Sequence, residues 1–233
     1  LLVSVDAALR GVPDIALGNV LGSNIANILL IVGVSALVWP IRVTGKSLRR
    51  DLTVMLAAAL TLVPIFALGQ MGRPAGLILF AGLVAYLVWA YRQPGEAAPD
   101  LPGTMPSGLM SALTVLGGLV ALMLGARFLV DGAVSIARGY GISEAFIGLT
   151  IVAVGTSLPE LATSLIAALR RQSEIAIGNI VGSNIFNILG ILGATAVIAP
   201  IPVSARFLAF DLPVMIAVSL LLAGLLLMLP VIG

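Results

Sequence analysis

The sequence predicts an all-α polytopic membrane protein with an inverted repeat of five plus five transmembrane helices, here truncated at both ends. Composition is the first observation, since 60% of the residues are hydrophobic, 9% are charged and the mean hydropathy is +1.19. The second observation is that apolar runs long enough to cross a bilayer recur along the chain. The third is an internal repeat with an offset of 160 residues.

Helices are predicted where apolar runs lie between polar turns. Residues 1–9 read as the end of a helix, and Trp39-Pro40 ends the first full span. Pro and Gly are concentrated in residues 92–108, which predicts the only linker. The seven full spans are expected at residues 14–39, 52–69, 75–91, 109–137, 142–169, 174–199 and 208–229.

Two segments of the chain are close copies. Residues 18–34, GNVLGSNIANILLIVGV, align with 178–194, GNIVGSNIFNILGILGA, and 11 of the 17 positions are identical. Counted in predicted spans, the copies are five crossings apart, so the second enters the membrane in the opposite direction. Inverted repeats of this kind place a substrate site at their interface near the bilayer midplane.

The repeat predicts how the chain is divided. We expect a first repeat half at 1–91, a cytoplasmic linker at 92–108 and a second half at 109–233. Under the 160-residue offset, the first half lacks its first helix and most of its second, and the second half lacks its last helix. Seven basic residues against four favour the linker side as cytoplasmic. The seven are Arg42, Lys46, Arg49, Arg50, Arg92, Arg170 and Arg171, and the four are Arg10, Arg73, Arg138 and Arg206.

Residues 148–160, GLTIVAVGTSLPE, interrupt the span 142–169 with polar groups. A carboxylate at bilayer depth is costly unless it meets a partner, so Glu160 is a functional-site hypothesis. Pro159 removes a backbone donor and is expected to open the helix near Gly155. Freed carbonyls, hydroxyls and a carboxylate at one depth are hard oxygen ligands, which predicts a cation site.

Serine and asparagine side chains repeat on other spans. Ser183 and Asn187 are four residues apart and share a helix face, and Ser23 and Asn27 repeat this pattern. Interhelical hydrogen bonding is the alternative interpretation, but the duplication favours ion ligands. A flexible set of carboxylate, hydroxyl, amide and carbonyl oxygens suits Ca²⁺ better than Mg²⁺.

Other polar residues are predicted to be structural. Asn24 and Asn184 are displaced around the helix from the ligand face, which favours capping or packing, and Asn19 and Asn179 are also expected to be structural. Arg127 and Asp131 are four apart and predict an intrahelical ion pair. Asp51 and Asp211 are expected at helix starts, as dipole or capping carboxylates.

The motif GTSLPE followed by GNxxGSNxxN resembles the α-repeat of the cation/calcium exchanger superfamily, and the resemblance covers nearly the whole chain. It implies a sodium/calcium exchanger of prokaryotic type in which Glu160 coordinates Ca²⁺ and Na⁺ alternately. Several relatives, including potassium-dependent ones, carry Asp at the position of Asn187. The absence of Asp at this position therefore argues against a potassium requirement. The further ligands that the resemblance implies are the Ala153 carbonyl, Thr156, Ser157, Ser183, Asn187, Ser23 and Asn27.

We therefore expect a secondary antiporter that exchanges Ca²⁺ for Na⁺ by alternating access. Exchange of Ca²⁺ or another divalent cation for H⁺ stays open because Glu160 could release a proton. A cation channel is less expected, since the ligands cluster at one depth rather than forming a filter.

Enzymatic activity is not expected. The chain has no Cys and no His, which excludes thiol chemistry and Cys/His zinc sites and leaves Ser157 without a histidine base. The net charge of +2 does not indicate nucleic-acid binding. The expected partners are the two transported ions and the lipid bilayer, with no cofactor, and a monomer in a prokaryotic inner membrane is the expectation.

Overall fold

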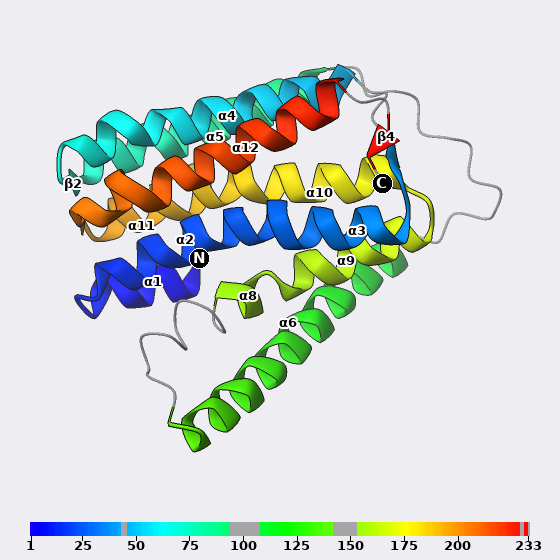
Figure 1. Ribbon diagram of the computed structural model, residues 1–233, viewed down its shortest axis with the longest axis horizontal. Helices are drawn as coiled ribbons and strands as arrows, with labels where there is room; N and C mark the ends of the chain where they lie inside the picture. Colours follow the sequence, from blue (N-terminus) through cyan, green and yellow to red (C-terminus); the bar gives the residue numbers. More distant parts are fainter. Residues whose placement is uncertain (43–45, 94–107, 142–152, 229–230, 233) are drawn as a thin grey trace.

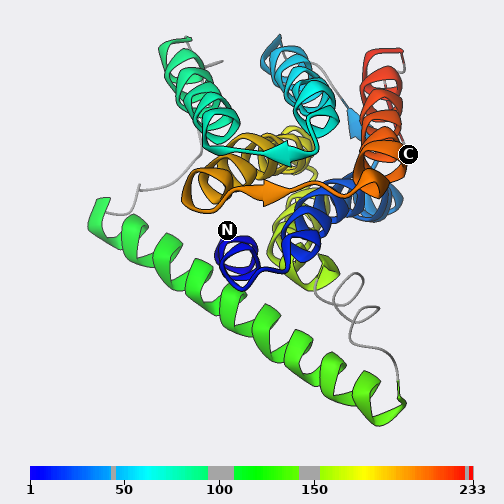
Figure 2. The same ribbon diagram turned by 90° about the vertical axis from the view of Figure 1, so that its left-hand side faces the viewer.

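The computed structural model describes residues 1–42, 46–93, 108–141, 153–228 and 231–232. Its helices lie side by side in a bundle, with the long helix α6 running diagonally across one side (Figures 1 and 2). The helices in the first part are α1 (Leu2–Leu9), α2 (Pro13–Ala26), η1 (Asn27–Val32), α3 (Gly33–Val38), α4 (Lys46–Ala67), α5 (Arg73–Arg92) and α6 (Gly108–Gly139). The later helices are α8 (Ala153–Thr156), α9 (Leu158–Leu169), α10 (Ser173–Ile185), η3 (Phe186–Leu192), α11 (Gly193–Ile198), η4 (Phe207–Asp211) and α12 (Leu212–Met228).

The predicted all-α membrane fold is confirmed. Within the described residues, six helical stretches are long and apolar enough to cross a membrane by length and composition. They correspond to six of the seven predicted spans, and the linker 92–108 lies almost entirely outside the described residues. The six stretches are Pro13–Val38, Ser47–Ala67, Arg73–Arg92, Gly108–Gly125, Ser173–Ile198 and Phe207–Met228.

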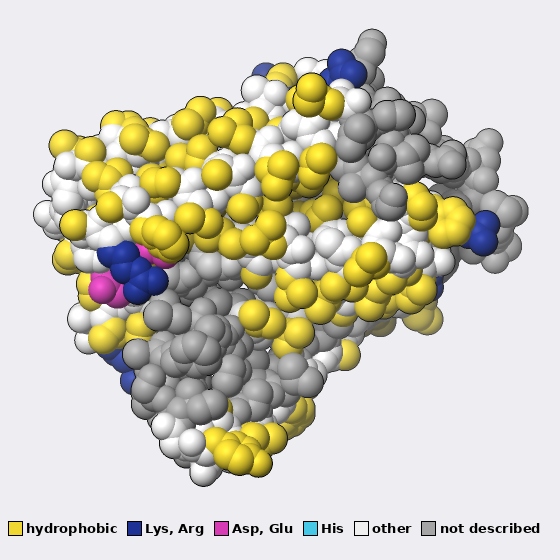
Figure 3. All heavy atoms as spheres, viewed as in Figure 1, with side chains coloured by type: hydrophobic (Ala, Val, Ile, Leu, Met, Phe, Trp, Pro, Cys, Tyr) yellow, Lys and Arg dark blue, Asp and Glu magenta, His cyan; other side chains and the backbone are white. Residues whose placement is uncertain are grey.

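The outer surface of the bundle is apolar. Figure 3 shows hydrophobic side chains spread over one face, while Lys and Arg side chains gather near its two ends. On α5 and α6, large side chains such as Ile78, Leu109 and Met123 are more than half exposed. This distribution fits a chain whose surroundings are hydrocarbon along its middle and water at its ends.

The internal repeat is visible in the backbone. Helix α2 continues through the π-helix η1 into α3, and α10 continues through the π-helix η3 into α11. Two short antiparallel strand pairs also repeat, β1 (Ile41–Arg42) with β4 (Val231–Ile232) and β2 (Gln70–Met71) with β3 (Ile201–Pro202). The sequence did not predict these strands or the π-helices. The two strand pairs lie at opposite ends of the bundle (Figure 1).

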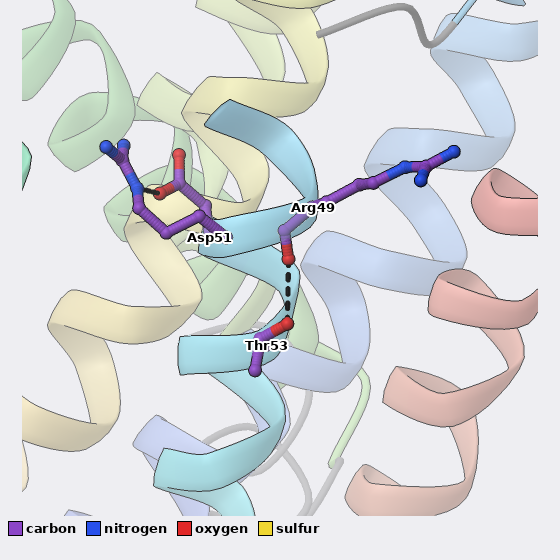
Figure 4. Close-up of polar contacts among 4 residues, drawn as sticks. Arg49, Asp51 and Thr53 are labelled. Atoms are coloured by element: carbon purple, nitrogen blue, oxygen red, sulfur yellow. Dashed lines mark hydrogen bonds and ion pairs between the residues drawn. The ribbon is translucent and has the colours of Figure 1, made fainter. Parts of the chain in front are cut away.

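The capping prediction for Asp51 and Asp211 is wrong. Helix α4 begins at Lys46 rather than residue 52, so Asp51 lies beyond the first helical turn, where it accepts from Arg50 Nε at 2.7 Å. Thr53 Oγ1 donates to the carbonyl oxygen of Arg49 at 2.8 Å, a bond along the helix (Figure 4). Asp211 ends η4, and its Oδ2 lies 3.2 Å from Arg206 Nε. The helices start before the apolar runs, so neither carboxylate caps a helix. Each one pairs instead with a nearby arginine.

The predicted ion pair on α6 is confirmed. Arg127 Nε lies 3.8 Å from Asp131 Oδ2, and both side chains are largely exposed. An exposed pair of this kind contributes less than about 1 kcal/mol.

Helices α5 and α11 touch through their backbones. A Cβ atom built on Gly76 would lie 2.7 Å from the carbonyl oxygen of Gly193, and one on Gly193 would lie 2.9 Å from the Phe80 nitrogen. Both distances are too short for real atoms and involve rigid backbone. The contact between these helices therefore requires glycine on each side, as in other small-residue helix contacts in membranes.

Replacing Gly76 with alanine is expected to separate α5 from α11 and to destabilise the fold by about 1–3 kcal/mol. The measurement is the midpoint temperature of unfolding in detergent. Gly82→Ala is the control on the same helix, because its Cβ would meet only the flexible Leu189 side chain at 3.7 Å. Equal midpoints for the two variants would contradict this account of the contact.

Candidate ion-binding site

The span that carries the GTSLPE motif is broken in the structure. Helix α8 ends at Thr156, Ser157 forms a turn, and α9 begins at Leu158 with Pro159 in its first turn. The break thus lies two residues beyond Gly155, because Pro159 fits the first turn of a new helix better than a helix interior. It places Glu160 in the first turn of α9, where the helix dipole favours a negative charge. Residues 142–152 of this predicted span lie outside the described residues.

The Glu160 carboxylate is the charged group of the predicted site. The residue is partly buried, and its Oε2 atom is fully buried without a hydrogen-bond partner among the described residues. Its backbone carbonyl accepts a hydrogen bond from Asn179 Nδ2 at 3.2 Å. A buried carboxylate oxygen without a partner is costly, so it needs either a proton or a cation beside it.

The hydroxyls beside the break reach the first repeat half. Thr156 Oγ1 lies 3.2 Å from Ser23 Oγ and donates to Asn19 Oδ1 at 3.1 Å. Ser157 and Ser23 are 3% and 6% exposed. Two of the predicted ligands, Thr156 and Ser23, are therefore brought together from segments 133 residues apart.

Four asparagines form two crossed pairs between α2–η1 and α10–η3. Asn27 Nδ2 donates to Asn184 Oδ1 at 3.0 Å, and Asn187 Nδ2 donates to Asn24 Oδ1 at 2.9 Å. The 160-residue offset converts one pair into the other. All four side chains are buried, and Asn27 Oδ1 has no hydrogen-bond partner among the described residues.

The crossed pairs change the interpretation of two residues. Asn24 and Asn184, which we expected to cap or pack, are the direct partners of the predicted ligands Asn187 and Asn27. The signal that could have found them is the repeated GSN tripeptide, since both copies hold Asn at this position. A helical wheel drawn for one helix does not contain contacts to another helix.

Asn19 and Asn179 repeat one structural contact, as expected for structural residues. Asn19 Nδ2 donates to Ser4 Oγ at 3.2 Å, and Asn179 Nδ2 donates to Ser164 Oγ at 3.0 Å. The two bonds are related by the same 160-residue offset. Each bond holds two helices that are consecutive along the chain against each other.

The remaining predicted ligands are less directly joined. Ser183 is partly exposed on α10, which packs along α9, and no hydrogen bond ties its side chain to the other predicted ligands within the described chain. Ala153 is the first residue of α8. The described part of the chain contains no group of three or more Asp, Glu, His or Cys side chains that could hold a metal. The predicted ligand set holds one carboxylate, Glu160, among neutral oxygens.

Comparison with known proteins identifies the family of this chain. The family described as "Sodium/calcium exchanger protein" matches residues 1–92 and 110–232. Inner membrane protein YrbG of Escherichia coli (strain K12) is 39% identical over 95% of this chain and 72% of its own length. Sodium/calcium exchanger MaX1 of Methanosarcina acetivorans is 32% identical over 94% of this chain and 75% of its own. A solved structure of the sodium-calcium exchanger NCX_Mj, soaked with 10 mM Na⁺ and zero Ca²⁺, superposes with a TM-score of 0.83 at 33% identity, covering 100% of this chain and 76% of that one.

Replacing Asn179 with leucine should weaken the packing of α9 on α10. The substitution removes the donors to the Glu160 carbonyl and to the fully buried Ser164 hydroxyl, at a cost of about 1–3 kcal/mol. The midpoint temperature in detergent measures the loss. Thr163→Val is the matched control, because the exposed Thr163 hydroxyl bonds only along its own helix, to the carbonyl of Pro159. A control that is as destabilised as Asn179→Leu would refute the assignment.

Proposed function

The chain belongs to the sodium/calcium exchanger protein family of cation antiporters, and we propose that it exchanges Ca²⁺ for Na⁺ by alternating access at a site around Glu160. The observation that carries this proposal is the buried Oε2 of that carboxylate at the start of α9, which has no hydrogen-bond partner within the described chain. A cation beside it would offset the cost of burying the charge. The chain is a multi-pass membrane protein and not an enzyme.

The proposed site combines Glu160 with neutral oxygens from both halves. The candidates include the Thr156 and Ser157 hydroxyls at the break, Ser23 on α2, which contacts Thr156 at 3.2 Å, and Asn27 Oδ1, which accepts no hydrogen bond from the described residues. Ser183, Asn187 and the Ala153 carbonyl complete the proposed set. Several oxygens of mixed type suit Ca²⁺, which accepts six to eight ligands in flexible geometry.

Competition between ions supplies the exchange mechanism. One carboxylate with a limited set of oxygens cannot hold a divalent ion and a full set of monovalent ions together, so binding of one species expels the other. An empty site leaves Glu160 Oε2 buried without a hydrogen-bond partner among the described residues, which disfavours crossing without an ion. The result is coupled transport in two directions, with no covalent chemistry.

The division of the chain belongs to the same proposal. The halves 1–91 and 109–233, with a cytoplasmic linker at 92–108, follow from the inverted repeat. The crossed asparagine pairs between Asn24 and Asn187 and between Asn27 and Asn184 support it, since each bond joins one half to the other. The proposed unit of transport is a monomer in a prokaryotic inner membrane.

Exchange of Ca²⁺ for H⁺ is the second candidate. The same Oε2 could be neutralised by a proton as well as by a metal ion. Sodium is favoured because MaX1 and NCX_Mj are both named as sodium and calcium exchangers. The hydroxyl and amide oxygens around Glu160 would also be needed to coordinate Na⁺ but not to hold a proton.

Glu160→Gln should reduce Ca²⁺ uptake at least ~10-fold, because an amide of the same shape cannot compensate the ion's charge. The measurement is radioactive calcium uptake by proteoliposomes loaded with Na⁺. Asp14→Asn, which removes an exposed carboxylate at the start of α2, is the control and should transport normally. Normal uptake by Glu160→Gln would remove the basis of the proposal.

The counter-ion is identified by the driving gradient. Proteoliposomes with an outward Na⁺ gradient should take up Ca²⁺ equally well with and without a protonophore. If the protonophore abolishes uptake, or if an outward H⁺ gradient drives it without Na⁺, the second candidate is correct and sodium exchange is not. Membranes without the protein give the background leak.

A further inference from the structure

Two buried methionines extend the crossed asparagine pairs. Asn184 Nδ2 lies 3.8 Å from Met55 Sδ, and Asn24 Nδ2 lies 3.5 Å from Met215 Sδ. Met55 and Met215 are each 1% exposed and are related by the 160-residue offset, like the asparagines they contact. Each contact joins one repeat half to the other. Two equivalent chains of contacts therefore run from Met55 through Asn184 to Asn27, and from Met215 through Asn24 to Asn187.

We propose that Met55 with Asn184, and Met215 with Asn24, are positioning residues that fix which way the Asn27 and Asn187 amides point. In this orientation the amide oxygen, and not the amide nitrogen, faces the transported cation. The inference rests on the proposed function, because it concerns how strongly the same site binds Ca²⁺. It assigns roles to four residues outside the predicted ligand set.

The orientation follows from what each partner can donate or accept. A thioether sulfur and a backbone carbonyl have no hydrogen to donate, so the Asn184 side chain must turn its NH₂ group toward Met55 Sδ and the Asn24 carbonyl, which is 3.5 Å away. Its Oδ1 is then left facing Asn27. A reversed Asn184 would place oxygen against these acceptors and NH₂ against the Asn27 NH₂.

The orientation of Asn27 is set in turn. Because Asn184 presents an oxygen at 3.0 Å, Asn27 must donate through Nδ2, and its own Oδ1 points away from that bond. That Oδ1 is the atom left buried without a protein partner within the described chain. A carbonyl oxygen coordinates a cation, whereas an NH₂ group would repel it. Asn187 is held in the same way, through its bond to Asn24 Oδ1 at 2.9 Å.

Burial makes this arrangement strong. Asn24, Asn27 and Asn184 are each 1% exposed, so water cannot replace a lost partner. Hydrogen bonds in such an environment are strengthened, and an unmatched donor or acceptor is costly. A sulfur at these distances is a weak acceptor by itself. Its effect is to penalise the reversed amide, since an oxygen facing it would have no donor.

Met55→Leu tests the proposal because it removes the acceptor at similar volume. We expect the Ca²⁺ concentration for half-maximal uptake to rise about 3–10-fold, with a smaller change in the maximal rate. Met71→Leu is the control, since Met71 is fully buried on β2 and contacts none of these asparagines by a hydrogen bond in the described chain. It should leave the half-maximal concentration unchanged.

An Asn27→Asp background separates positioning from packing. A carboxylate presents oxygen in either orientation, so Met55→Leu should no longer raise the half-maximal Ca²⁺ concentration in Asn27→Asp protein. The proposal is overturned if Met55→Leu leaves the half-maximal concentration unchanged in otherwise unaltered protein, or if its effect persists undiminished in the Asn27→Asp background. Those results would leave the proposed function intact. Absence of Ca²⁺ transport by the unaltered protein would instead contradict the proposed function and this inference together.

Discussion

The structure depends on the buried contact between two copies of one segment. The α2–η1 and α10–η3 helices meet through the asparagine bonds of 2.9 Å and 3.0 Å, which cross from one repeat half to the other. Amide pairs can form in only one register, because shifting either helix by one residue would replace a donor or acceptor with an apolar side chain. The pairs therefore fix how the halves lie against each other. The same placement of the two halves brings Thr156 Oγ1 to 3.2 Å from Ser23 Oγ.

The π-helices explain how one span can make a polar contact in its first part and pack through apolar side chains in its later part. Up to Asn27 the backbone is α-helical, so Ser23 and Asn27 share a face, and η1 begins at Asn27. A π segment adds a residue to the turn and rotates the later part of the helix about its axis, and such segments occur frequently at functional sites. Beyond the polar pair, Ile31 and Val32 are buried against the rest of the bundle. The same change occurs at η3, which begins at Phe186 and contains Asn187.

Much of the fold could be predicted because hydropathy and repetition are one-dimensional signals. The spans, the break beside Pro159 and the pairing of halves all follow from spacing along the chain. Helix starts were less accurate, since polar residues such as Lys46 can precede an apolar run within one helix. The partners of Asn24 and Asn184 were missed because they lie on another helix. The repetition of the GSN tripeptide is the sequence signal that could have suggested them.

Lipid surroundings give these polar contacts a larger role than they would have in water. Apolar side chains gain little by leaving hydrocarbon for a protein interior, so helix association depends on close packing and on hydrogen bonds between helices. In this chain the close packing is the backbone contact at Gly76 and Gly193, and the hydrogen bonds are the asparagine pairs. An amide has two ends, and Asn27 uses its nitrogen to hold the halves together while its oxygen stays unpaired within the described chain. In the proposed mechanism one side chain serves both stability and ion binding, and a substitution that reversed the amide would change the second without removing the first.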